Sequence, residues 1–200
     1  MFDLLEKGGP LMYPIMLCSV VTIMFGIERA WHYARALRHA GQAEEIHRLI
    51  EQGDLFAAEN LARQTSGPVA AVLVAGLQYR TQPLGIIEEE ISLCGGSELQ
   101  RLNKHLHILE LVGRIAPLMG LLGTVLGMVE AFKGIAGRGT VEPSVLAGGI
   151  WEALITTVAG LCVAIPAMVL HHFFEDRVQS FAHQMKHYGA EAVKHLGDRA

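Results

Sequence analysis

Residues 146–169 read LAGGIWEALITTVAGLCVAIPAMV and give the clearest indication of what kind of protein this is. The run is apolar almost throughout, and about 20 apolar residues are enough for a helix to cross the hydrocarbon core of a bilayer. Glu152 is the exception. A carboxylate near the centre of a membrane helix costs roughly 2.5–3.5 kcal/mol on insertion scales, so it faces a protein interior or a wet cavity, or it stays protonated. We therefore interpret Glu152, with Thr156 and Thr157 beside it, as a candidate ion path.

Helix geometry separates these three side chains. At about 100° per residue, Thr156 lies one turn from Glu152 on nearly the same face, whereas Thr157 lies about 140° further round and faces a neighbouring helix or another side of a pore. The alternative is that Glu152 only bonds a neighbouring helix. Further along, Pro166 leaves a carbonyl near Cys162 without its usual donor, which predicts a kink. A tolerated membrane proline without a gating role explains Pro166 equally well.

Composition places the chain between soluble and wholly membrane-embedded proteins. Of its 200 residues, 51% are hydrophobic and 18% are charged, and the mean hydropathy is +0.33. We expect a membrane protein with a sizeable aqueous part. The net charge of −4 provides no basic field that would bind nucleic acid.

The sequence predicts no metal site, cofactor or covalent catalysis. The cysteines Cys18, Cys94 and Cys162 are far apart and match neither a disulfide framework nor a zinc site. His183 and His187 have a spacing that could bind a metal, but no third ligand is evident, so we interpret them as a surface pair. The sequence contains no nucleophile elbow, phosphate loop or redox pair, and we therefore expect a protein that is not an enzyme.

Hydropathy divides the chain into seven predicted segments. A signal peptide could explain the first apolar run, but its start is acidic, with Asp3 and Glu6 against Lys7, and no cleavage site follows, so we expect a retained span. The fold class is then an all-α membrane protein with three transmembrane helices and long cytoplasmic helical extensions. In order, the segments are a periplasmic N-terminus (1–10), a first transmembrane helix (11–30), a cytoplasmic helical domain (31–114), a second transmembrane helix (115–132), a periplasmic loop (133–145), a third transmembrane helix (146–170) and a cytoplasmic C-terminal helix (171–200).

Positive charges set the predicted orientation. Eight Lys and Arg residues lie between the first two spans and four lie in the C-terminal tail, against three on the other side of the membrane. Because cytoplasmic segments carry the excess of positive charge, the tail is expected in the cytoplasm and the N-terminus outside it. Glu152 then lies in the outer half of the membrane.

The predicted cytoplasmic domain is a series of helices separated by breakers. We expect helices at 43–52, 55–64 and 69–79, with Gly53 ending the first and Asp54 capping the second. A longer helix begins at Leu84, and Gly95-Gly96 weakens it enough for a break. No strand-like alternation occurs in this segment.

Small residues in the second and third spans predict close helix packing. In lipid, two small residues separated by three other residues let two helix backbones approach closely. Van der Waals contact between the helices then drives their association. Thr124 is the only hydroxyl of the second span, and Glu130 lies near the end of that span, within reach of water. The predicted packing residues are Ala116, Gly120, Gly123, Gly127 and Gly160.

These segments resemble a known family. The second span and its surroundings, GRIAPLMGLLGTVLGMVEAFKGIA, and the third, LAGGIWEALITTVAGLCVAIPAMVLHHFFEDRV, are similar to the ExbB/TolQ/MotA proton-channel family and most similar to its ExbB-type biopolymer transport branch. The resemblance covers roughly the last half of the chain. The first span and the cytoplasmic helices agree with the family in layout only.

The resemblance implies a function and a site. Such proteins form a ring, thought of as a pentamer, in the bacterial inner membrane around the helices of a one-span partner of the ExbD/TolR kind. Proton flow driven by the proton motive force energises outer-membrane transport, in some systems through a TonB-like protein. The family's membrane glutamate corresponds to Glu152 and its pore threonines to Thr124 and Thr157, while the partner supplies the main proton-binding aspartate.

Two departures and several alternatives stay open. Many relatives have Ala-Pro-Gly before the third span, where this chain has Ala147-Gly148-Gly149, so no loop role is carried over. The flagellar stator branch usually has four spans, which argues against a swimming motor. A TolQ-like role in envelope maintenance and a non-conducting membrane scaffold are the alternatives, and Na⁺ in place of H⁺ is not excluded.

Overall fold

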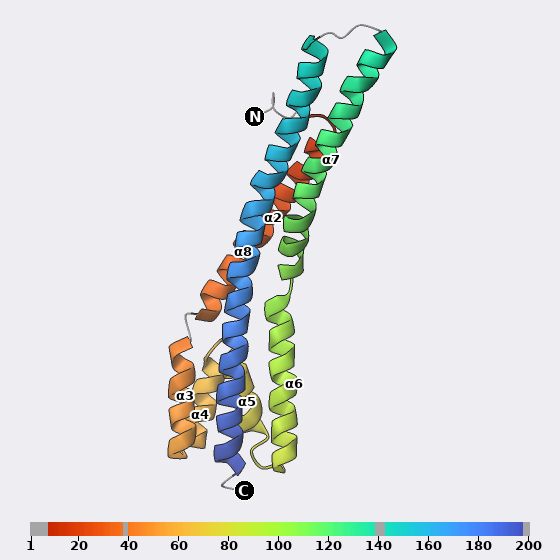
Figure 1. The fold of residues 1–200 in the computed structure, drawn as a ribbon. Coiled ribbons are helices and arrows are strands. Elements are labelled where there is room, and N and C mark those ends of the chain that lie inside the picture. The colour runs from red at the N-terminus through yellow and green to blue at the C-terminus, as the bar shows by residue number, and fades with distance from the viewer. Residues whose placement is uncertain (1–7, 38–39, 139–142, 198–200) are drawn as a thin grey trace. The chain divides into compact units, whose positions relative to one another are not determined.

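The computed structural model describes residues 8–37, 40–138 and 143–197, and all the regular structure in them is helical (Figure 1). This confirms the predicted all-α class. The helices are α2 (Met12–Leu37), α3 (Ala40–Gln52), α4 (Leu55–Gln64), α5 (Pro68–Gln78), α6 (Leu84–Asn103), α7 (Leu106–Arg138) and α8 (Pro143–Gly197).

The chain divides into two compact units. The membrane unit comprises Met1–Glu28 and His105–His172, and the polar unit comprises Arg29–Lys104 and Phe173–Ala200. Helices α2 and α8 each lie partly in the membrane unit and partly in the polar unit. All of the predicted site residues belong to the membrane unit.

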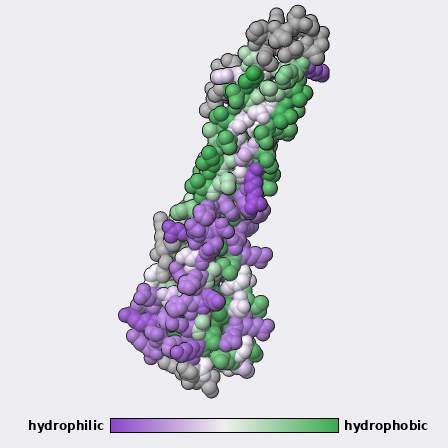
Figure 2. Space-filling view, in the orientation of Figure 1, coloured by the Kyte–Doolittle hydropathy of each residue, from purple (hydrophilic) through white to green (hydrophobic). Residues whose placement is uncertain are grey.

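Among the described residues, three helical stretches are long and apolar enough to cross a membrane: Met12–Gln52, Leu84–Gly134 and Ala147–Gly197. Their number agrees with the three predicted spans. Large apolar side chains on α7 and α8, such as Leu118, Val125 and Ile165, are more than half exposed. On the face shown in Figure 2, the membrane unit is largely hydrophobic, whereas the surface of the polar unit is largely hydrophilic. A hydrophobic exterior of this kind is stable in lipid, where helices satisfy their own backbone hydrogen bonds.

The polar unit is built around α5. Seven of the eleven residues of α5 are buried, as expected for a helix that is apolar on all sides. A methyl group added at Gly76 of α5 would lie 2.8 Å from Ile91 of α6, so these two helices pack closely. The buried Tyr33 of α2 donates a hydrogen bond of 2.8 Å to the Leu102 carbonyl and stacks on Phe174 of α8.

Local sequence signals placed several helix ends correctly. Gly53 has φ of +86°, a left-handed conformation that ends α3 at little steric cost. The Asp54 carboxylate accepts a hydrogen bond of 3.0 Å from the Ala57 N–H and caps α4, as predicted. The ends of α4 and α5 lie within a residue of their predicted positions.

Helix α6 runs through Gly95-Gly96 to Asn103, so the break that these glycines would allow does not form there. The interruption falls instead at His105, whose φ of 67° lies in the left-handed region. The His105 ring packs on Phe25, with centroids 4.9 Å apart, and its Nδ1 lies 3.2 Å from Glu28 Oε2. Histidine tolerates this backbone better than most residues, and contacts with α2 hold it there.

Candidate ion path

Helices α7 and α8 approach each other through glycine. A methyl group added at Gly120 would lie 3.0 Å from the Thr156 carbonyl oxygen, and one added at Gly127 would lie 3.0 Å from the Gly149 oxygen. At Gly160 the added carbon would lie 2.5 Å from the Ala116 oxygen. Each distance is shorter than ordinary contact: a Cβ at Gly160 would overlap backbone, and one at Gly120 or Gly127 would require the neighbouring backbone to shift by a few tenths of an ångström. The predicted packing residues thus lie where α7 and α8 touch.

Thr156 belongs to this contact and is 1% exposed. Its hydroxyl donates to the carbonyls of Glu152 and Ala153 at 3.0 and 2.9 Å. A methyl group at Gly123 would overlap the Thr156 side chain. Thr156 is therefore satisfied within its own helix and packed against α7, and its hydroxyl is already engaged with backbone.

Thr157 forms a hydrogen bond between the helices, and Thr124 does not. The Thr157 hydroxyl donates to the Gly120 carbonyl across the contact at 3.0 Å. The Thr124 hydroxyl donates to the Leu121 carbonyl of its own helix at 2.6 Å. Thr124 lines an open, mainly apolar groove on α7 that also includes Phe132. Within one chain, then, the two threonines do not line a common space.

Glu152 lines a cavity of about 300 Å³ near the start of α2. The cavity contains two further charged side chains, Glu130 and Lys133 of α7, and neither Thr124 nor Thr157 lines it. The Glu152 carboxylate lies against Gly9, where a Cβ would overlap Oε1. The sequence indicated Glu130, near the end of the second predicted span, but neither Gly9 nor Lys133. The turn-forming residues Gly8, Gly9 and Pro10 were the sequence signal for an unusual backbone there.

Pro166 lies inside α8, which continues past it to Gly197. The predicted kink at Pro166 stays a prediction. Helix α7 also contains a proline, Pro117, next to the packing residue Ala116. Glu110 and Arg114 form an ion pair one turn apart on α7, at 2.6 Å.

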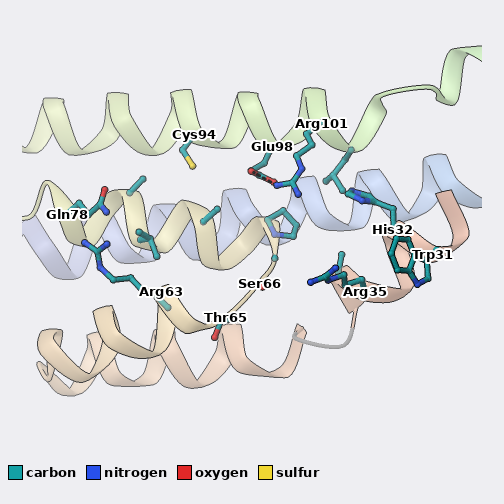
Figure 3. A pocket seen from close by; sticks show the side chains of 18 residues that line it. Trp31, His32, Arg35, Arg63, Thr65, Ser66, Gln78, Cys94, Glu98 and Arg101 are labelled. Carbon is teal, nitrogen blue, oxygen red and sulfur yellow. Dashed lines mark hydrogen bonds and ion pairs between the residues drawn. The ribbon is translucent and has the colours of Figure 1, made fainter. Parts of the chain in front are cut away.

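A larger cavity of about 830 Å³ lies in the polar unit, and none of the predicted ion-path residues lines it. Figure 3 shows its charged side chains, Arg35 from α2, Arg63 from α4, and Glu98 and Arg101 from α6. Arg63 also donates to Glu59, which lies outside the cavity, at 2.9 Å. Hydrogen bonds from Arg63 and then Arg80 hold the pKa of the Glu59 carboxyl below its usual value. Among the described residues, no group of histidines, cysteines or carboxylates is placed to hold a metal ion.

Comparison with known proteins identifies the family. The profile of the MotA/TolQ/ExbB proton channel family matches residues 64–187. The biopolymer transport protein exbB1 of Vibrio cholerae is 35% identical over 177 residues, which cover 83% of this chain and 75% of that protein. A biopolymer transport protein called ExbB-like 1, from Synechocystis sp., is 31% identical over 196 residues, which cover 95% of this chain and 75% of its own length. ExbB of Salmonella typhimurium is 44% identical over 70 residues, 35% of this chain and 29% of that protein.

The motifs of the second and third spans had indicated similarity over roughly the last half of the chain. The matches reach further and include much of the polar unit. The similar proteins carry names of biopolymer transport proteins, and the family is one of proton channels. This chain belongs to the MotA/TolQ/ExbB proton channel family.

Proposed function

We propose that this chain is the ring subunit of an inner-membrane complex that uses the proton motive force to energise transport across the outer membrane. Its N-terminus lies in the periplasm and its C-terminus in the cytoplasm, with spans at 11–30, 115–132 and 146–170. The ring is a homopentamer that encloses the transmembrane helix of a one-span partner of the ExbD/TolR kind. The ExbB names of the similar proteins support this proposal.

The observation that carries the proposal is a carboxylate within a candidate membrane-spanning helix. Glu152 lies on α8 beside a cavity with two other charged groups, Glu130 and Lys133, rather than among apolar side chains alone. Placing an ionisable residue at such a position costs free energy, and a role in an ion path explains why the residue is there. Thr124 and Thr157 would complete a polar lining once neighbouring subunits and the partner are present.

Energy conversion needs a protonation step that changes a preferred arrangement. One proton that crosses 100 mV releases about 2.3 kcal/mol. An ionised carboxylate on the partner's helix can face the ring only where polar groups of the ring contact it. Once the carboxylate is protonated, the partner's helix no longer favours that orientation. In this scheme Glu152 and the threonines supply the polar groups, and the partner supplies the carboxylate that binds the proton.

The test is proton flux into liposomes that contain the chain and its partner. Glu152→Ala should abolish the flux, because it removes the carboxylate from the path. Glu110→Ala is the matched control, since it removes a carboxylate from an ordinary ion pair with Arg114, and its flux should equal that of the wild type. Unchanged flux in Glu152→Ala would refute the proposed role of Glu152.

Glu152→Gln separates the channel from a membrane scaffold without ion passage. An amide still forms hydrogen bonds, so a scaffold keeps its function in this variant, whereas a path that needs an ionisable group loses its flux. Outer-membrane transport and TolQ-like envelope maintenance are separated by complementation, in which the gene is returned to strains that lack one or the other activity.

A further inference from the structure

The cavity beside Glu152 is partly open, and two parts of the membrane unit besides α8 form its walls. One wall is α7, which contributes the charged residues Glu130 and Lys133. The other is the turn of residues 8–11 that leads into α2, which contains no ionisable side chain. Figure 1 shows this turn passing beside the paired helices α7 and α8. Among the described residues, the charged side chains that line the cavity are Glu130, Lys133 and Glu152, which belong to α7 and α8.

The turn requires glycine at position 9 for two separate reasons. Gly9 has φ of +66°, in the left-handed region that residues with a Cβ rarely adopt. Its missing side chain also leaves the space that the Glu152 carboxylate occupies, because a Cβ there would overlap Oε1. The Met12 N–H donates to the Gly9 carbonyl at 3.2 Å and ties the turn to the start of α2. The turn thus lies directly against the carboxylate.

The size and lining of the cavity favour water inside it. Its volume of about 300 Å³ is far above the roughly 10–15 Å³ that a single water molecule needs. Two carboxylates and an ammonium group provide the polar partners that hold water beside Glu152, where an unsolvated charge within a membrane span is costly. Water held by these charged groups forms a route along which a proton can move.

We propose that Glu130 and Lys133 line the aqueous route by which protons reach Glu152 from the periplasmic side, and that the turn at residues 8–11 covers the carboxylate. This inference rests on the proposed function, because the route matters only where protons pass. Glu130 and Lys133 act as positioning residues that keep the cavity hydrated. Gly9 sets how closely the cover fits over Glu152.

The experiment measures how fast a water-soluble carbodiimide, with an amine nucleophile, modifies Glu152 in the full chain in membranes, followed by peptide mass spectrometry. Gly9→Ala should raise this rate by about 5- to 30-fold, the factor that corresponds to the usual cost of a non-glycine residue in the left-handed region. Gly53→Ala is the matched control, because Gly53 is also left-handed, with φ of +86°, but does not line the cavity. Its rate of Glu152 modification should equal that of the wild type.

A second arm blocks the route. Lys133→Cys is made in a chain whose native cysteines, Cys18, Cys94 and Cys162, are replaced by serine. A charged, membrane-impermeant thiosulfonate added from the periplasmic side then attaches a bulky group at position 133. Carbodiimide modification of Glu152 should be several-fold slower after this attachment than in the same Lys133→Cys chain before attachment.

Two results would overturn the inference. One is a rate in Gly9→Ala equal to that in Gly53→Ala, and the other is a modification rate that a group at position 133 leaves unchanged. Retained helical circular dichroism in each variant excludes unfolding as the cause. The proposed function fails separately, through unchanged proton flux in Glu152→Ala, and that flux measurement does not depend on the carbodiimide rates.

Discussion

Replacing Gly160 by alanine tests whether glycine sets the distance between α7 and α8. The added carbon would lie 2.5 Å from the Ala116 oxygen, and ordinary contact begins at 3.4 Å. The obstacle is backbone, which cannot rotate away, so the helices must separate by about 0.9 Å, the difference between the two distances. The bond from Thr157 to the Gly120 carbonyl, now 3.0 Å, would then stretch toward about 3.9 Å, beyond hydrogen-bonding range.

The expected cost follows from these two effects. Overpacking costs typically about 1–3 kcal/mol, and an interhelical hydrogen bond in a membrane protein contributes about 0.6 kcal/mol. Gly148→Ala is the matched control, since it lies on the same helix with nothing within 4 Å of the added carbon, and both variants share any gain in helix propensity. Gly160→Ala should therefore be less stable than Gly148→Ala by about 2–3.5 kcal/mol.

Thermal unfolding in detergent, followed by circular dichroism, measures this difference. At roughly 2–4 °C per kcal/mol for a chain of this size, the Tm of Gly160→Ala should lie about 4–14 °C below that of Gly148→Ala. Equal Tm values would refute the reasoning, because they would mean that α7 and α8 can accommodate a methyl group without separating.

Two further changes have defined outcomes. Thr157→Val keeps the shape of the side chain but removes the 3.0 Å bond to Gly120, so it should lower stability by about 0.6–1.7 kcal/mol in the same assay, and no change would mean that the bond contributes nothing. Because Arg63 and Arg80 lower the pKa of Glu59, the stability that this carboxylate provides is present above its unfolded pKa and is lost as pH falls through the folded pKa. Glu59→Gln should thus flatten the loss of stability as pH falls through the folded pKa of this group, measured as Tm against pH, and a slope equal to that of the wild type would contradict it.

Local chemistry explains why some helix ends could be predicted and others could not. Asp54 and Gly53 act on their own neighbours, so their residue types alone indicated an end and a cap. The break at His105 depends on contacts with Phe25 and Glu28 of α2. Those partners are distant in sequence, and no glycine or proline marks the position. Stronger local breakers at Gly95-Gly96 do not end α6, which runs through both glycines.

The candidate site likewise combines a feature that local sequence indicates with contacts between residues that are distant in sequence. Glu152 could be identified from the sequence, because the free energy of placing a carboxylate in a membrane depends on residue type and depth alone. Its surroundings depend on which residues of α7 and of the N-terminal turn meet it, and no periodicity in the sequence carries that information. The positions of Gly9 and Lys133 beside Glu152 therefore could not be predicted from the sequence.

The packing on either side of Glu152 limits what protonation can move. One turn towards the N-terminus of α8, Gly149 lies against the backbone of Gly127, and one turn towards its C-terminus, Thr156 fills the space beside Gly123. Packed contacts of this kind switch between discrete arrangements and do not deform gradually. We infer that α7 and α8 act as one rigid pair, and that a change of charge at Glu152 shifts whatever lies against the carboxylate rather than the helix that carries it. On the proposed function, motion driven by proton flow would belong to the partner's helix and the N-terminal turn, while the paired helices would hold the charge in a fixed place.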